Sequence, residues 1–84
     1  MLYVVHLKRS AEKELDCLPA KIRDRVIKQI ISLKDNPRPF GSHELQSRDG
    51  FRIRVGDYRI LYIINEKEKK IDIISVAHRK EVYR

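Results

Sequence analysis

Cysteine is almost absent from this sequence of 84 residues. The only one is Cys17, which excludes an internal disulfide and any zinc cluster built from cysteines. A single free thiol suits a reducing compartment. Because Cys17 stands beside Leu18 at the end of a helical pattern, we expect it to be a small, buried or half-buried apolar residue rather than a nucleophile.

Long apolar runs are also missing. No stretch approaches the roughly 20 apolar residues of a membrane-spanning helix, and no signal-peptide core precedes a cleavage site. Carboxylates and histidines with metal-ligand spacing are lacking too, because Asp57 lies in a tight turn and Asp72 stands apart. We therefore expect a cytoplasmic protein with no membrane partner, no metal and no cofactor.

Acidic residues are too few to balance the basic ones. The chain has 19 Lys and Arg against 12 Asp and Glu, for a net charge of +7 and a pI near 9.8. Residues 1–50 hold 10 basic and 7 acidic residues (+3), and residues 51–84 hold 9 and 5 (+4), so neither half is a basic tail. We expect one domain, residues 1–84, attracted to phosphates, acidic proteins or anionic membranes.

The most informative stretch is segment 51–64, FRIRVGDYRILYII, which predicts a β-hairpin. A two-residue loop at Gly56 and Asp57 places Arg54 directly opposite Arg59. Facing residues of an antiparallel pair share one side of the sheet. One side is then apolar: Phe51, Ile53, Val55, Tyr58, Ile60 and Tyr62.

Arg52, Arg54 and Arg59 gather on the other side of this hairpin, together with Leu61 and Ile63. Like charges opposite each other cost up to about 1 kcal/mol, so a role outside folding should explain them. Our interpretation is a site for a polyanion, since clustered charge in a partly apolar cleft is typical of functional sites. The alternative is an ordinary solvated sheet face.

The rest of the chain predicts an α+β fold. Residues 2–7 predict a strand, Ser10 is expected to cap a helix that stops before Pro19, and Pro19 is expected in the first turn of a second helix. That second helix carries the strongest apolar stripe in the chain: Ile22, Val26, Ile30 and Leu33, widened by Ile27 and Ile31.

Residues 36–50 predict a connector with Leu45 in the core, and residues 71–77 predict a central strand. The order is strand, helix, helix and three strands, with the last three joined as antiparallel hairpins. The simplest packing places the helix pair on one face of the sheet. The face with the arginines is then left partly open.

At this point the sequence resembles the RelE/ParE family of bacterial and archaeal toxins, and most closely its RelE branch of ribosome-dependent mRNA endoribonucleases. The likeness lies in FRIRVGDYRILYII, in ISVAHRKEVY at residues 74–83, and in a short helical hairpin with a downstream Asn-Pro. These motifs follow the family's order and cover nearly the whole chain. The resemblance implies the RelE-like fold of microbial ribonucleases, an antiparallel-rich sheet on a helical hairpin.

The resemblance also implies the roles of individual residues. It assigns catalysis to five residues that bind the phosphates or help to activate the ribose 2′-hydroxyl: Arg52, Arg54, Arg59, Arg79 and Tyr83. The residues implied to bind RNA are Arg52, Arg54, Arg59, Arg79 and Lys80.

The sequence does not identify the general base. Arginine stays protonated above about pH 12, so it clamps phosphate but is a poor base. Tyr83 could serve once neighbouring arginines lower its pKa, or could stack on a base, or could plug the core. His78 titrates in the useful range and is the rival. Strand alternation places His78 on the side of Asp72, Ile74 and Val76, where a structural role is equally open.

The implied function is that of a type II toxin that cleaves translated mRNA in the ribosomal A site, without metal, by in-line attack of the 2′-hydroxyl, and so inhibits translation and growth. Two alternatives are a ParE-type toxin that poisons DNA gyrase and a non-catalytic RNA-binding module. The implied partners are a cognate, RelB-like antitoxin and the ribosome with its mRNA. The toxin-antitoxin complex is expected to reach operator DNA through the antitoxin.

Overall fold

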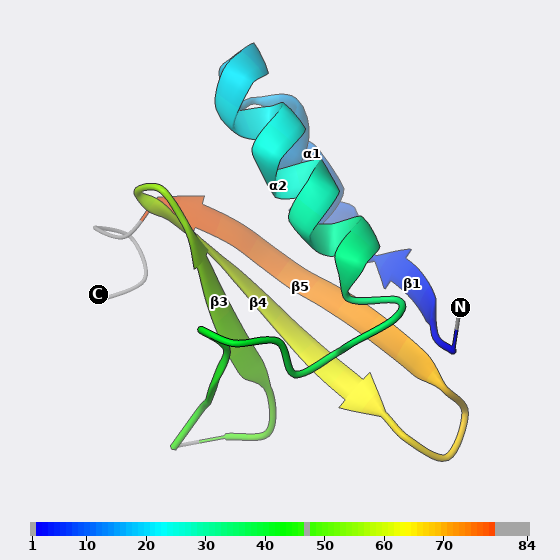
Figure 1. The fold of residues 1–84 in the computed structure, drawn as a ribbon. Coiled ribbons are helices and arrows are strands. Elements are labelled where there is room, and N and C mark those ends of the chain that lie inside the picture. The colour runs from blue at the N-terminus through cyan, green and yellow to red at the C-terminus, as the bar shows by residue number, and fades with distance from the viewer. Residues whose placement is uncertain (1, 47, 79–84) are drawn as a thin grey trace.

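The computed structural model describes residues 2–46 and 48–78 (Figure 1). In chain order the elements are β1 (Val4–Leu7), α1 (Arg9–Asp16), α2 (Ala20–Ser32), β2 (His43–Glu44), β3 (Phe51–Val55), β4 (Tyr58–Asn65) and β5 (Lys70–His78). The strands form one sheet in the order β1-β5-β4-β3-β2. The predicted α+β architecture is confirmed, and β5 is an interior strand between β1 and β4, in agreement with the prediction that residues 71–77 are not at an edge.

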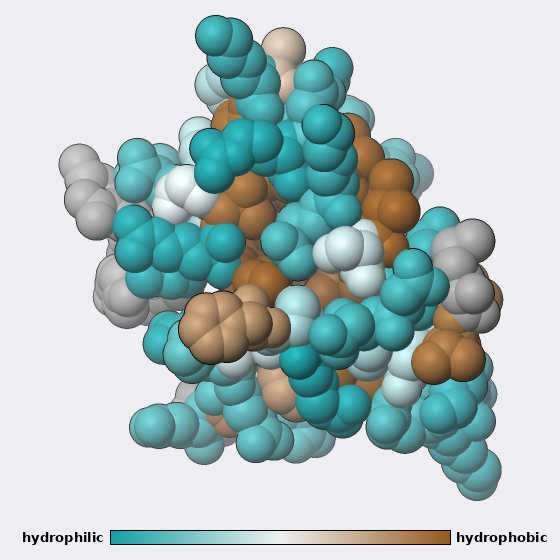
Figure 2. Space-filling view, viewed as in Figure 1, coloured by the Kyte–Doolittle hydropathy of each residue, from teal (hydrophilic) through white to brown (hydrophobic). Residues whose placement is uncertain are grey.

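The sheet is mostly antiparallel, and the helices cover one of its faces. Strands β2 to β5 pair antiparallel, whereas β1 runs parallel to β5 because the two helices carry the chain between β1 and the hairpins. The core lies between the helices and the apolar side of the hairpin strands, and its fully buried large side chains are Tyr62, Leu33, Ile60, Ile71, Ile73, Val26 and Val76. In the same view, mostly hydrophilic residues cover the visible surface (Figure 2).

Helix α2 buries a narrower stripe than its sequence predicts. Val26, Ile30 and Leu33 are buried, but the side chains of Ile27 and Ile31 are 36% and 51% exposed. Ile27 and Ile31 each follow a core residue by one position, and one position turns the side chain by about 100° around the helix. Because α2 packs against one layer only, those two residues point away from the core, and the widened stripe is wrong.

The start of α1 also differs from the prediction. Lys8 is the N-cap residue and makes no capping hydrogen bond from its side chain. The Ser10 hydroxyl instead donates to the Ile74 carbonyl oxygen (3.2 Å), and Glu14 Oε1 accepts from the Val76 N–H (3.0 Å). Strand β1 pairs only with residues 70–73 of β5, so these side chains satisfy the remaining edge of β5.

Two smaller expectations fail near the helices. Pro19 is the N-cap of α2 rather than its first helical residue, a shift of one position. Cys17 is exposed, not buried, because it follows the last turn of α1 and faces solvent. No helix within the described residues is long and apolar enough to cross a membrane.

The connector at 36–50 contains a fifth strand that its sequence does not reveal. His43 and Glu44 pair with Arg52 and Phe51 of β3. Two residues are too few to show a period of two. Leu45 is half-buried and lies outside the core cluster, so its predicted place in the core is wrong.

Tyr62 fastens the first half of this connector to the sheet. Its side chain is 1% exposed, and its hydroxyl donates to the carbonyl oxygen of buried Pro37 at 2.8 Å. Burial raises the pKa of Tyr62, because the charged form would lose its hydration. Tyr62 therefore stays neutral and remains a donor over the ordinary pH range.

Tyr62→Phe should lower the free energy of unfolding by about 1–3 kcal/mol, because a buried carbonyl loses its hydrogen-bond donor. Urea denaturation measures the change. The matched control is Tyr58→Phe, whose hydroxyl bonds to none of the residues described in the structure. Equal losses in the two variants would contradict the assigned role of the Tyr62 hydroxyl.

Glu66 links the β4–β5 turn to the start of the chain. It accepts a hydrogen bond from the Tyr3 hydroxyl and lies 3.5 Å from Arg38 Nη1. The hydrogen bond from Tyr3 is the main cause that lowers the pKa of the Glu66 carboxyl below its ordinary value of 4.5, and the charges of Arg38 and Lys69 add to it.

The lowered pKa predicts how stability depends on pH. A carboxyl with a depressed folded pKa contributes stability above its unfolded pKa and loses it as pH falls through the folded value. Wild type should therefore exceed Glu66→Gln in unfolding free energy at pH 7, and the gap should close as the pH falls from about 4.5 toward 2. A gap that is equal at both ends of a pH series of thermal melts would refute the linkage.

Candidate nucleic-acid interface

The arginines of the β3–β4 hairpin share one face of the sheet, as the sequence predicts. Arg54 pairs with Arg59, and Arg52 pairs with Leu61. Gly56 has a φ of 60°, a left-handed conformation that costs glycine little, and it closes the two-residue loop that sets this register. We call the side that holds Arg52, Arg54, Arg59, Leu61 and Ile63 the arginine face.

Buried apolar residues lie beneath these arginines. Leu61 is 9% exposed and Ala77, which pairs with Arg59, is 7% exposed, yet neither belongs to the core cluster under the helices. The guanidinium groups therefore rise from an apolar base rather than from a fully solvated surface. A low local dielectric strengthens their attraction for an anion.

The charge on this face is not neutralised internally at two of its three arginines. Within residues 2–46 and 48–78, no carboxylate forms an ion pair with Arg52 or Arg54. Arg54 Nε donates to the Gly56 carbonyl oxygen at 2.8 Å, which holds its guanidinium near the hairpin turn. A phosphate group is a suitable partner for a guanidinium group held in this way.

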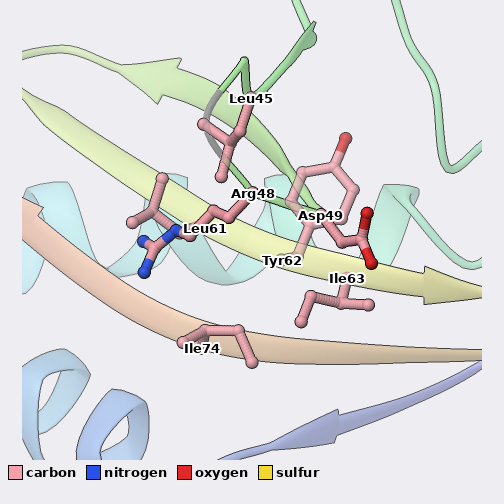
Figure 3. A pocket seen from close by; sticks show the side chains of 7 residues that line it. All are labelled: Leu45, Arg48, Asp49, Leu61, Tyr62, Ile63 and Ile74. Carbon is pink, nitrogen blue, oxygen red and sulfur yellow. The ribbon is translucent and has the colours of Figure 1, made fainter.

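A shallow hollow of about 70 Å³ continues the arginine face (Figure 3). Its lining residues come from the β2–β3 loop, β4 and β5, and they are Leu45, Arg48, Asp49, Leu61, Tyr62, Ile63 and Ile74. The sequence does not single out Arg48, Asp49 or Ile74 for this site. The only indication of this hollow in the sequence is that Leu61 and Ile63 alternate with core residues and so lie on the arginine face.

A β-bulge in β5 decides which side of the sheet each late residue takes. Tyr62 pairs with Ile73 and Leu61 with Ser75, so Ile74 is an extra residue between them. Strict alternation predicts that Asp72 and Val76 share a side. The bulge reverses the alternation, so Asp72 pairs with Ile63 on the arginine face, whereas Val76 lies in the core.

His78 is affected by the same bulge. It pairs with Tyr58, whose side of the sheet carries the helices, and the two rings meet edge to face with centroids 5.3 Å apart. His78 therefore lies on the opposite side of the sheet from Arg54 and Arg59. The expectation that it shares a side with Asp72 is wrong, and the geometry favours a structural role.

The remaining predicted site residues, Arg79, Lys80 and Tyr83, lie outside the described residues. The structure therefore brings together Arg52, Arg54 and Arg59, and the catalytic roles of all these residues stay predictions. Within the described part of the chain, no three His, Cys, Asp or Glu side chains are grouped so that they could hold a metal ion.

The fold and this face define a class: a small α+β domain with arginines clustered on the side of its sheet that faces away from the helices. Residues 5–83 match the family described as the ParE toxin of the type II toxin-antitoxin system parDE. Toxin RelE of Mycobacterium tuberculosis is 31% identical over 84 residues, which cover 98% of this chain and 87% of that protein. Toxin RelG of the same organism is 31% identical over 86 residues, which cover 100% of this chain and 99% of that protein.

Solved structures agree with this likeness. The RelBE2 toxin-antitoxin complex of Mycobacterium tuberculosis matches with a TM-score of 0.82 and 28% identity, covering 94% of this chain and 100% of that one. The archaeal RelE-RelB complex of Pyrococcus horikoshii matches with a TM-score of 0.80 and 30% identity, covering 94% and 97%. The chain belongs to the RelE/ParE superfamily of toxins from type II toxin-antitoxin systems.

Charge reversal tests whether the arginine face binds RNA. Arg54→Glu should weaken binding to single-stranded RNA at least about tenfold and reduce the dependence of log K on log salt by about 0.7 per lost phosphate contact. Lys28→Glu makes the same charge change on an exposed position of α2 and should do far less. Fluorescence anisotropy over a salt series measures both; identical effects would mean that only net charge matters.

Proposed function

We propose that this toxin is a metal-independent endoribonuclease that cleaves translated mRNA in the ribosomal A site. The observation that carries the proposal is the pairing of Arg54 with Arg59 beside Arg52 over an apolar base. This arrangement opposes like charges at a cost to folding, and a phosphodiester that is held there compensates for it. The names of the curated relatives, Toxin RelE and Toxin RelG, point to the same branch.

The proposed reaction needs charge stabilisation more than covalent chemistry by the protein. The ribose 2′-oxygen attacks the adjacent phosphorus in line, the 5′-oxygen leaves, and negative charge develops on the phosphoryl oxygens. Arg52, Arg54, Arg59 and Arg79 neutralise that charge. We assign the proton transfers to Tyr83, because the described position of His78 faces the helices.

The ribosome supplies the orientation that the small domain lacks. Holding the 2′-oxygen, the phosphorus and the leaving oxygen in line contributes several kcal/mol or more in well-oriented reactions. We therefore propose that the activity depends on the ribosome, so that the free protein cleaves RNA feebly. This action would inhibit translation and growth in the cytoplasm.

Expression of the chain in growing bacteria, followed by mapping of mRNA 5′ ends, tests this function. Cuts should lie inside translated regions in phase with the reading frame. Arg79→Ala and Tyr83→Phe should each reduce cutting by about 10²-fold, the loss typical of a removed transition-state contact. Lys28→Ala, on the exposed side of α2, should not. Unchanged cutting by the first two variants would refute their roles.

A cognate antitoxin of the RelB kind is the proposed partner. The solved relatives from Mycobacterium tuberculosis and Pyrococcus horikoshii are complexes with such antitoxins. An acidic or amphipathic segment that covers the arginine face and the helices would complement the charge of +7. We propose that the complex binds operator DNA through the antitoxin.

Gyrase poisoning is the second candidate, and the family match over residues 5–83 favours it, because that family is described by its ParE toxin. The same fold can serve both activities. Under this candidate, expression induces the DNA-damage response while mRNA stays intact. The mapping experiment above, run beside a damage reporter, distinguishes the two.

A further inference from the structure

The hollow beside the arginine face has the chemistry of a site for a nucleobase. Leu61, Ile63 and Ile74 contribute apolar surface from two neighbouring strands, and Leu45 contributes from the loop above them. Ile63 is 39% exposed although β4, in which it lies, is an interior strand of the sheet. An apolar surface of this kind suits the flat face of an aromatic ring.

Two charged residues complete the hollow at different ends. In Figure 3 the Arg48 guanidinium points toward Leu61, whereas the Asp49 carboxylate points toward the Ile63 end. No described residue forms an ion pair with either side chain. A carboxylate only accepts hydrogen bonds and a guanidinium only donates them. The hollow therefore suits a ring with donors on one edge and acceptors on another.

The loop backbone next to Asp49 is held close to β4 at Gly50. The Leu45 N–H donates to the Gly50 carbonyl oxygen at 2.9 Å, which closes the loop. Gly50 has a φ of 134°, and a Cβ there would lie 3.1 Å from the Tyr62 carbonyl oxygen and 3.2 Å from Leu45 Cδ1. Only glycine lets the loop lie this close to β4, so the rim of the hollow is pre-formed.

The hollow is continuous with the arginines. Leu61, which lines it, is the register partner of Arg52, so facing side chains there are about 5 Å apart at their Cβ atoms. A nucleotide whose phosphate contacts Arg52 can therefore place its base over the hollow. The arginines next to the hollow therefore favour a nucleotide of RNA over a small uncharged ligand, which would not contact them.

Among the four RNA bases, guanine matches the two charged ends. Its N1–H and N2–H are adjacent donors that suit the two oxygens of Asp49, and its O6 and N7 are acceptors that suit an arginine. Adenine presents the acceptor N1 where guanine has a donor, which a carboxylate repels. Cytosine and uracil have one ring and at most one donor group on the equivalent edge.

We propose that the hollow bounded by Arg48 and Asp49 binds a guanine base of the RNA strand whose phosphate lies on the arginine face. The proposal deepens the proposed function and rests on it, since it identifies one base of the substrate. Asp49 is then a specificity residue that acts on binding, and the arginines supply attraction that is independent of sequence.

Binding of labelled oligouridylates that carry a single central guanine, adenine or cytosine tests the proposal without requiring cleavage. Wild type should prefer the guanine oligomer by about tenfold, in line with a good bidentate pair. Asp49→Asn should lose that preference and keep its affinity for the plain oligouridylate. Asp57→Asn, the same change in the exposed hairpin turn, should retain it. Thermal melts check that both variants fold.

Each result decides the matter. Loss of guanine preference in Asp49→Asn alone supports the proposal. Wild type without base preference overturns it, as does an Asp49→Asn variant that keeps the preference. An Asp49→Asn variant that binds RNA normally but loses affinity for an antitoxin peptide also overturns it, and makes the hollow a protein-binding site. Absence of in-frame mRNA cuts would reject the proposed function, a separate outcome from that of this assay.

Discussion

The register of the β3–β4 hairpin is the constraint on which the rest of the structure depends. The turn at Gly56 and Asp57 fixes Arg54 opposite Arg59, and this choice assigns every later residue of both strands to a side. A slip of one residue would exchange the faces, burying arginines under the helices and exposing Ile53 and Ile60. The core and the cationic surface are thus two results of one turn, and neither could change alone.

Much of the architecture could be predicted because it follows from strong local patterns. The sequence predicts three such features: the alternation through the hairpin, the apolar period of α2 and the order of elements. The predictions that were wrong concern positions whose burial or pairing depends on tertiary context. Ile27 and Ile31 were predicted to be buried, but a helix that packs against a single layer buries only a narrow stripe. Strand β2 has two residues, and its existence depends on its partner.

In the candidate site, too, the residues set by a local pattern could be predicted and those set by tertiary context could not. Arg52, Arg54 and Arg59 could be placed together because a two-residue loop leaves one register. The side of the sheet on which His78 lies could not be predicted. An extra residue at Ile74 reverses the alternation, and no residue type in the sequence indicates a bulge there. Arg48 and Asp49 were missed because a loop residue acquires a position only from what its backbone packs against, here through Gly50.

The two outer strands of the sheet, β1 and β2, are only four and two residues long. Each presents few unpaired backbone groups to the surroundings, and α1 covers the rest of the edge beside β5 through Ser10 and Glu14. Short edges are poor templates for adding a strand from another molecule. Together with mutual repulsion from a charge of +7, they limit self-association of the chain.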